Sequence, residues 1–135
     1  MNKIKKMLFI ATATIFTAHA SFATTTSFFL RVINKTGIPG ELSVTSQDST
    51  GGTATYGPTI DGTGAIQWLY KAPKETNYIF LNSTIGNKMA YMCYTNNGRL
   101  EFNVSKYKGD DVIITLEKQT GMGNLTCTCS GSACA

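Results

Sequence analysis

The chain has a single histidine, His19, and none after that position. Catalytic triads in which an imidazole activates a serine or cysteine therefore have no base in residues 20–135. The chain also lacks a glycine-rich phosphate-binding pattern and a Cys-x-x-Cys redox motif. These absences exclude the commonest nucleophilic, nucleotide-dependent and thiol-exchange enzymes.

The chain also lacks an apolar run long enough for a membrane span, which needs about 20 apolar residues. Its longest run, residues 7–18, is interrupted by threonines and preceded by Lys3, Lys5 and Lys6. Small residues then occupy the positions required for cleavage after Ala20 or after Ala23. A basic start, a short apolar segment and a small-x-small end are typical of a secretory signal. Residues 1–23 are predicted to be a cleaved signal peptide, so the mature protein is secreted or periplasmic, with no stable membrane anchor.

The excess of positive charge belongs mostly to the predicted signal. The chain has twelve Lys and Arg and eight Asp and Glu, and three of the cations are Lys3, Lys5 and Lys6. Without them the formal charge falls from +4 to about +1, and His19 leaves with the same segment. No Lys/Arg cluster then remains to neutralise phosphates, so nucleic-acid binding is not expected.

The pattern of residues 24–120 is that of short strands separated by turn residues. Apolar and polar residues alternate with period two, and no stretch has helical spacing. Asn96-Asn97-Gly98 is the clearest turn, because Asn-Gly suits a two-residue hairpin. Residues 46–55 are polar and are expected to form a loop or weak hairpin. The sequence predicts a single antiparallel β-sandwich of about seven or eight strands, with strands at residues 27–34, 41–46, 65–70, 78–82, 88–95, 99–104 and 111–119.

The four cysteines follow the predicted signal, and three of them lie in a Gly/Ser-rich tail, residues 121–135. An even number in a small exported domain indicates disulfides. Pairing Cys127 with Cys129 is disfavoured, because one intervening residue strains the bridge. Two pairings remain, in which Cys93 bonds Cys127 or Cys129 and Cys134 takes the other. Either pairing tethers the tail to the sandwich. Soft-metal binding by the same thiolates is the alternative, but a structural zinc site would need all four.

The acidic residues fall mostly in turns or at outward strand positions, so paired catalytic carboxylates are not expected. Asp110-Asp111 is a possible calcium ligand pair, yet two adjacent acids before a strand are more typical of a turn. The chain is therefore predicted not to be an enzyme and to need no cofactor or metal.

Aromatic residues are the best candidates for ligand contacts. Trp68 and Tyr70 share one face of a predicted strand, whereas Tyr94 and Tyr107 adjoin turns. Trp68 is also the kind of lone tryptophan that fills the space between two sheets. The candidate contact residues are thus Trp68, Tyr70, Tyr94 and Tyr107.

These features favour an exported, non-enzymatic binding module for a carbohydrate or protein partner. One alternative is a subunit of a surface assembly in which residues 27–34 are exchanged between copies as a strand. Another is a membrane-active secreted toxin, for which residues 88–95 are the only amphipathic aromatic stretch.

Overall fold

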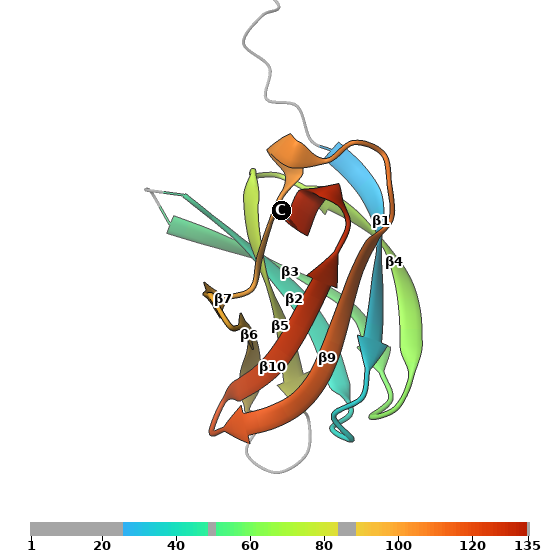
Figure 1. The fold of residues 1–135 in the computed structure, drawn as a ribbon, viewed down its shortest axis with the longest axis vertical. Helices are drawn as coiled ribbons and strands as arrows, with labels where there is room; N and C mark the ends of the chain where they lie inside the picture. Colours follow the sequence, from blue (N-terminus) through green and yellow to red (C-terminus); the bar gives the residue numbers. More distant parts are fainter. Residues whose placement is uncertain (1–25, 49–50, 84–88, 135) are drawn as a thin grey trace, which may run out of the picture.

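The computed structural model describes residues 26–48, 51–83 and 89–134, and the predicted signal peptide and its cleavage sites lie outside them. The described chain is almost entirely β-structure (Figure 1). Ten strands and two short 3-10 helices follow in the order β1 (Thr26–Asn34), β2 (Gly40–Asp48), β3 (Gly51–Ile60), β4 (Ala65–Ala72), β5 (Thr76–Ser83), β6 (Ala90–Thr95), β7 (Gly98–Arg99), β8 (Glu101–Asn103), η2 (Val104–Lys106), β9 (Val112–Gly121), β10 (Asn124–Ser130) and η3 (Ser132–Cys134).

The strands form one mixed, nearly closed sheet in the order β3-β2-β5-β6-β10-β9-β1-β4, with β7 beside β6 and β8 beside β5. β1 runs parallel to β9, and β10 runs parallel to β6. The all-β class is confirmed, but the prediction of a purely antiparallel sandwich is wrong. Period-two alternation tells which side chains share a face, whereas strand direction depends on which distant strand becomes the neighbour.

The core lies between the two halves of this sheet. Inward side chains alternate along β1 and β5, where every second residue is buried. Phe28, Tyr70 and Phe102 meet edge to face near its centre, with ring centroids 6.0–6.2 Å apart. This geometry is favourable for aromatic pairs because a positive ring edge meets a negative ring face.

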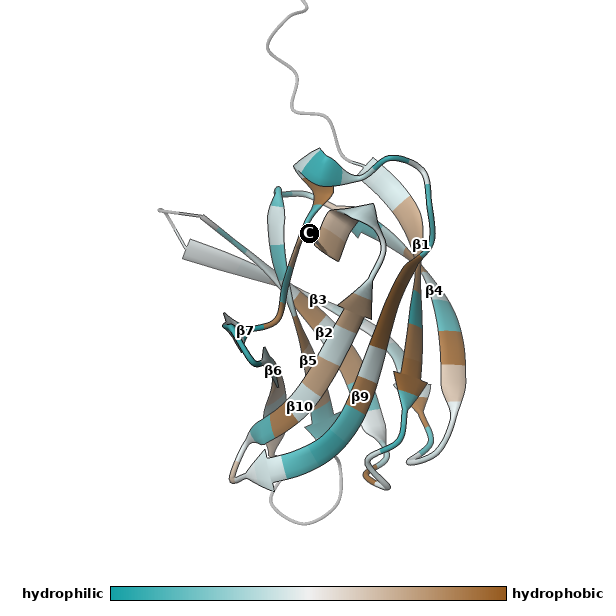
Figure 2. Ribbon diagram, in the orientation of Figure 1, coloured by the Kyte–Doolittle hydropathy of each residue, from teal (hydrophilic) through white to brown (hydrophobic). Residues whose placement is uncertain are grey.

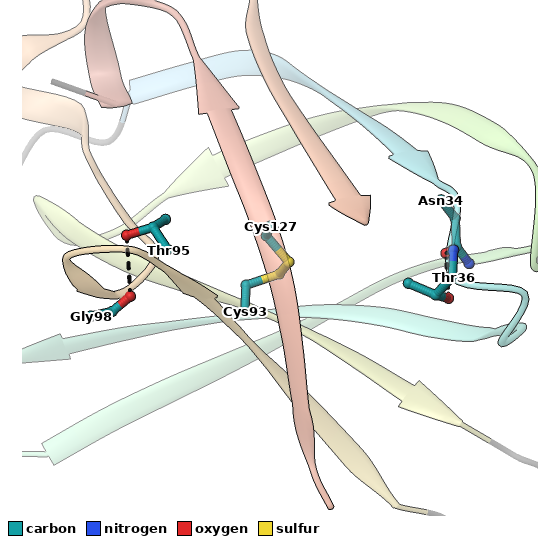
Figure 3. Close-up of a disulfide and its surroundings, with 6 residues drawn as sticks. All are labelled: Asn34, Thr36, Cys93, Thr95, Gly98 and Cys127. Atoms are coloured by element: carbon teal, nitrogen blue, oxygen red, sulfur yellow. Dashed lines mark hydrogen bonds between the residues drawn. A yellow bond between two sulfur atoms is a disulfide. The ribbon is translucent and has the colours of Figure 1, made fainter. Parts of the chain in front are cut away.

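The segment predicted to be a tethered tail is instead part of the sheet. β10 lies between β9 and β6, and its Leu125 and Cys127 are buried. The Cys93–Cys127 disulfide joins β6 to β10 across their parallel pairing (Figure 3). The second disulfide, Cys129–Cys134, fastens η3 to the end of β10. Disulfides are confirmed, in one of the two predicted pairings, and no cysteine is left with a free thiolate for a metal.

Residues 46–55 were expected to form a loop or weak hairpin, and the hairpin is what forms: residues 46–48 belong to β2, residues 51–55 belong to β3, and the two strands pair antiparallel. Residues 51–54 are exposed on both faces of the strand, and their composition is Gly, Gly, Thr and Ala. A strand at the end of a sheet forms ladder hydrogen bonds with only one neighbouring strand, which for β3 is β2. It therefore needs no apolar stripe, which is the signal that sequence alternation detects.

A hairpin at Asn96-Asn97-Gly98 is confirmed, but Gly98 already belongs to β7, whereas the Asn-Gly signal predicts it as one of the two turn residues. Thr95 and Gly98 are paired across β6 and β7, so Asn96 and Asn97 form the tip. The Thr95 hydroxyl donates to the Gly98 carbonyl at 3.2 Å, as Figure 3 shows.

A buried asparagine closes the end of β1. Asn34 is 1% exposed, and its amide donates to the carbonyls of Ile38 and Asp61 at 2.8 and 3.0 Å. Its carboxamide oxygen accepts from the amide and the hydroxyl of Thr36 (Figure 3). These bonds link the turn after β1 to the turn before β4 and so fix where the two strands begin to pair.

β1 pairs with β4 and β9 of its own chain and supplies four buried residues, Phe28, Leu30, Val32 and Asn34. A truncation that begins after Asn34 would remove part of the core as well as an exchangeable strand. Strand exchange between copies stays a prediction. Within the described residues, no helix has the length and apolar character needed to cross a membrane.

Asp110 holds the C-terminal 3-10 helix in place. The Ser132 hydroxyl donates to its carboxylate, as does the Ser132 amide at 2.7 Å, and these bonds lower the pKa of Asp110 below 3.8. A depressed folded-state pKa stabilises the protein above the unfolded pKa, and the effect is lost as the pH falls through the folded value.

We therefore expect Asp110→Asn to destabilise the protein at neutral pH, and the difference from wild type to shrink below about pH 3.8. Thermal unfolding followed by circular dichroism from pH 2 to 7 measures this difference. A difference that stays constant over this range would show that the charge of Asp110 has no part in it.

Candidate functional site

Tyr70, one of the four predicted contact residues, lies inside the molecule. Its ring is 1% exposed, and its hydroxyl donates to the Asn77 side-chain oxygen at 2.6 Å. Asn77 is itself fully buried and donates to the Lys74 carbonyl. Burial raises the pKa of Tyr70 to about 12, since the phenolate cannot be solvated there. Tyr70 therefore supports the core and cannot touch a ligand at the surface.

Tyr70→Phe is expected to lower the free energy of unfolding by about 1–3 kcal/mol, because it leaves the Asn77 oxygen buried without its donor. Urea unfolding at pH 7 measures the loss. Tyr94→Phe is the control, since a half-exposed hydroxyl can be replaced by water; equal losses in the two variants would contradict this role. Because the pKa of Tyr70 is raised in the folded protein, wild-type stability is also expected to fall as the pH rises above 10. In that range the Tyr70 hydroxyl ionises first in the unfolded chain.

Trp68 fills the seam between the two ends of the sheet. A side chain at Gly57 of β3 would come within 2.6 Å of the Trp68 indole, so the ring lies directly on the Gly57 backbone. The indole also meets Tyr70 edge to face at 5.4 Å. Trp68 is half-buried against the core. This position agrees with the interpretation that Trp68 fills space within the fold rather than contacting a ligand.

Tyr107 is likewise half-buried, and its ring packs on Phe28 with centroids 5.0 Å apart. Tyr94 differs from the other three, because it lies on the outer surface of β6 while its neighbour Cys93 points into the core. The four predicted contact residues therefore do not form one surface, and Tyr94 is the one on an outer face.

Around Tyr94 lies a group of residues that we call the aromatic face: Tyr78, Phe80, Met92, Tyr94 and Arg99. Phe80 pairs with Met92 across β5 and β6, and Tyr94 pairs with Arg99 across β6 and β7. The Arg99 guanidinium stacks over the Tyr78 ring at 4.3 Å from its centroid. A stacked guanidinium keeps its N–H groups free at the rim. The sequence signal for this face is the run Tyr78-Ile79-Phe80-Leu81, which is apolar at both parities.

A second surface with exposed apolar side chains lies on β1 and β4, at one end of the sheet. Phe29 of β1 is 52% exposed and Leu69 of β4 is 54% exposed. The two are direct cross-strand partners, so their side chains stand side by side on the outer face. Figure 2 shows apolar bands along the ribbons of β1, β9 and β4, which are neighbours in the sheet. We call Phe29 and Leu69 the Phe29–Leu69 patch.

Two cations flank the patch. Arg31 and Lys71 are both exposed, lie two residues from Phe29 and Leu69 on the same face, and pair with Gln67 and Ser27 respectively. Neither β1 nor β4 contains an acidic residue. A hollow of about 330 Å³ opens next to Arg31 and is bounded by Ala65, Ile66 and Gln67. The patch is thus apolar at its centre and positively charged at its margins.

β4 ends the sheet on this side. In the described residues its strand neighbour is β1, and its other edge approaches β3 only near the turn that joins them. Within the described residues no strand pairs with the other edge of β4, and the Trp68–Gly57 contact is made by the indole ring.

The patch was missed from the sequence although a signal was present. Phe28-Phe29 and Trp68-Leu69-Tyr70 are apolar at both parities of their strands. The residues on one face of each strand fill the core. The residues on the other face must point outward unless a second layer of the protein covers them. Only the cross-strand register shows that Phe29 and Leu69 meet.

No known protein family and no curated protein matches the chain. One solved structure, an NMR structure of a protein from Eubacterium rectale, is similar over 84% of this chain and 95% of that one. The two are 11% identical, with a TM-score of 0.44. A likeness of this degree has no bearing on function.

Proposed function

We propose that this chain is an exported, non-enzymatic binding module that recognises a protein partner through the Phe29–Leu69 patch. The observation that carries the proposal is the pairing of two half-exposed large apolar side chains at an open end of the sheet. Single exposed apolar residues are ordinary on protein surfaces, whereas adjacent ones at an edge are typical of interaction sites.

The patch has no evident purpose in the folded monomer. The inward residues of the same strands, Phe28, Leu30 and Tyr70, already fill the core. Polar residues at Phe29 and Leu69 would leave that packing intact and would lower the risk of edge-to-edge aggregation. Their retention as apolar residues is explained if a partner covers them and thereby removes apolar surface from water.

The compartment fits such a role. The two disulfides indicate an oxidising environment outside the cytoplasm. Together with the signal expected in residues 1–23, they support a secreted or periplasmic protein whose partner lies in the same compartment.

The test compares three variants of the mature protein as bait for periplasmic and culture-supernatant proteins of the source organism. Leu69→Ser and Phe29→Ser are expected to abolish capture of the specific partner. Met122→Ser is the matched control, because Met122 is 84% exposed but lies away from the patch, after β9. Capture that is equally strong with Leu69→Ser and wild type would contradict the proposal, as would equal loss with Met122→Ser.

A carbohydrate ligand on the aromatic face is the second candidate function. It is favoured by Tyr94 beside Arg99, since an aromatic ring can stack on a sugar while a stacked guanidinium donates to its hydroxyl or acidic groups. A glycan array probed with wild type, Tyr94→Ala and Tyr56→Ala tests it. Tyr56 is the control, being 66% exposed on β3. Silence of the array, or binding that survives Tyr94→Ala, would remove this candidate.

A further inference from the structure

We infer, on the basis of the proposed function, that the partner adds an extended strand to β4, with an apolar residue opposite Leu69 and acidic residues two positions to either side. The partner is thus defined by a pattern, acidic-x-apolar-x-acidic, in a β-conformation. The following observations lead to it.

β4 can accept such a strand along residues 67–72. An edge strand presents backbone N–H and C=O groups that have no ladder partner on one side, and these groups pair with a further extended chain. Within the described residues β4 pairs with β1 alone, and the Gly57 contact is made by the Trp68 indole rather than by the backbone edge, so the added strand can span residues 67–72.

Side-chain period fixes which residues of the added strand meet the patch. Strand side chains alternate between faces, so every second residue of the partner lies on the outer face. The residue opposite Leu69 contacts Leu69 and adjoins Phe29, which favours an apolar side chain. The residues two positions away lie opposite Gln67, which is paired with Arg31, and opposite Lys71.

The positive charges of Arg31 and Lys71 favour acidic residues at the two flanking positions of the added strand. Arg31 and Lys71 are exposed and no acidic residue of β1 or β4 balances them. Asp111 precedes β9 and is on the far side of β1 from the open edge. Carboxylates on the partner would complement both cations, whereas lysines opposite them would repel.

A second copy of this chain is a poorer occupant. Antiparallel pairing of two β4 strands about Leu69 would place Gln67 opposite Lys71 of the other copy. Apolar residues would match, but four cations would gather on one face with no acid from β1 or β4 to neutralise them. A strand with flanking acidic residues removes this excess.

The probe is a capped seven-residue peptide, Thr-Glu-Thr-Leu-Thr-Glu-Thr, titrated into the isotope-labelled mature protein at low salt and followed by backbone amide NMR shifts. Saturable shifts are expected at residues 67–72 and at Phe29. The matched peptide with lysine in place of both glutamates is expected to bind roughly fivefold more weakly, because two exposed ion pairs are exchanged for repulsion. Met122→Ser should leave both affinities unchanged.

Arg31→Glu combined with Lys71→Glu supplies the decisive comparison. Both side chains are exposed, so the variant keeps its fold, and it should now prefer the lysine peptide. Absence of saturable shifts at residues 67–72, or an unchanged peptide preference in the variant, would overturn the inference.

Sedimentation of the mature protein tests whether a second copy of this chain, rather than an acidic strand, occupies the edge of β4. A monomer is expected; a dimer abolished by Leu69→Lys would assign the edge to a second copy and overturn the acidic-strand inference. If Leu69→Ser abolishes partner capture while the glutamate peptide fails to bind, the strand pattern is wrong and the proposed function stands. If Leu69→Ser leaves capture intact, the proposed function itself fails.

Discussion

Replacing Cys93 and Cys127 together with alanine is expected to lower the free energy of unfolding by about 4 kcal/mol. This disulfide spans a sequence separation of 34, and closing so long a loop removes much conformational freedom from the unfolded chain. Both cysteines are also buried in the core between β6 and β10, so the alanines leave unfilled space.

The second disulfide provides the comparison. Cys129 and Cys134 are separated by only five positions, so the same loop-closure argument gives about 2 kcal/mol. Both are half-buried against the core, so less packing is lost with them than with the fully buried pair. Urea unfolding of the two double-alanine variants without reductant measures the difference. A larger loss from the Cys129/Cys134 pair would show that β10 is not held chiefly through β6.

Gly57→Val is expected to destabilise the protein by about 1–3 kcal/mol through overpacking at the seam. A Cβ at position 57 would lie 2.6 Å from ring atoms of Trp68, and the indole must move outward to make room. Trp68 is the only tryptophan, so its fluorescence reports this movement without interference. The emission maximum should shift to longer wavelength as the ring gains contact with water.

Gly121→Val is the control for the seam variant. Its added Cβ would have one neighbour within 4 Å, the Asn124 side-chain nitrogen at 3.8 Å. It is expected to change neither the stability nor the emission of Trp68. Unshifted emission in Gly57→Val would mean that the indole does not close the seam between β3 and β4.

The strands that carry a clear apolar stripe were predictable from the sequence. β1 and β5 bury every second residue, and the Asn96-Asn97-Gly98 hairpin follows from local turn chemistry. β10 was not predictable, because a Thr/Cys-rich strand becomes central only through its two neighbours and a disulfide. Local sequence carries no information on those neighbours.

The candidate surfaces were predictable only in part. Tyr94 was selected beside a turn and lies on an outer face, but Tyr70 was selected with equal reason and is buried with Asn77 as its acceptor. Both are aromatic residues in strands, and only the packing of the opposite half of the sheet separates them. The Phe29–Leu69 patch depends on the β1–β4 register, which no short-range pattern determines.

The central claim is that a protein partner covers the Phe29–Leu69 patch. Its most direct test is site-specific photo-crosslinking in producing cells, with a photoreactive amino acid at position 69, 122 or 94 of the full chain. A discrete adduct is expected at position 69, with none at position 122, although Met122 is the more exposed of the two. An adduct at position 94 alone, or no adduct at 69, would contradict the claim and move the binding surface to the aromatic face or away from both.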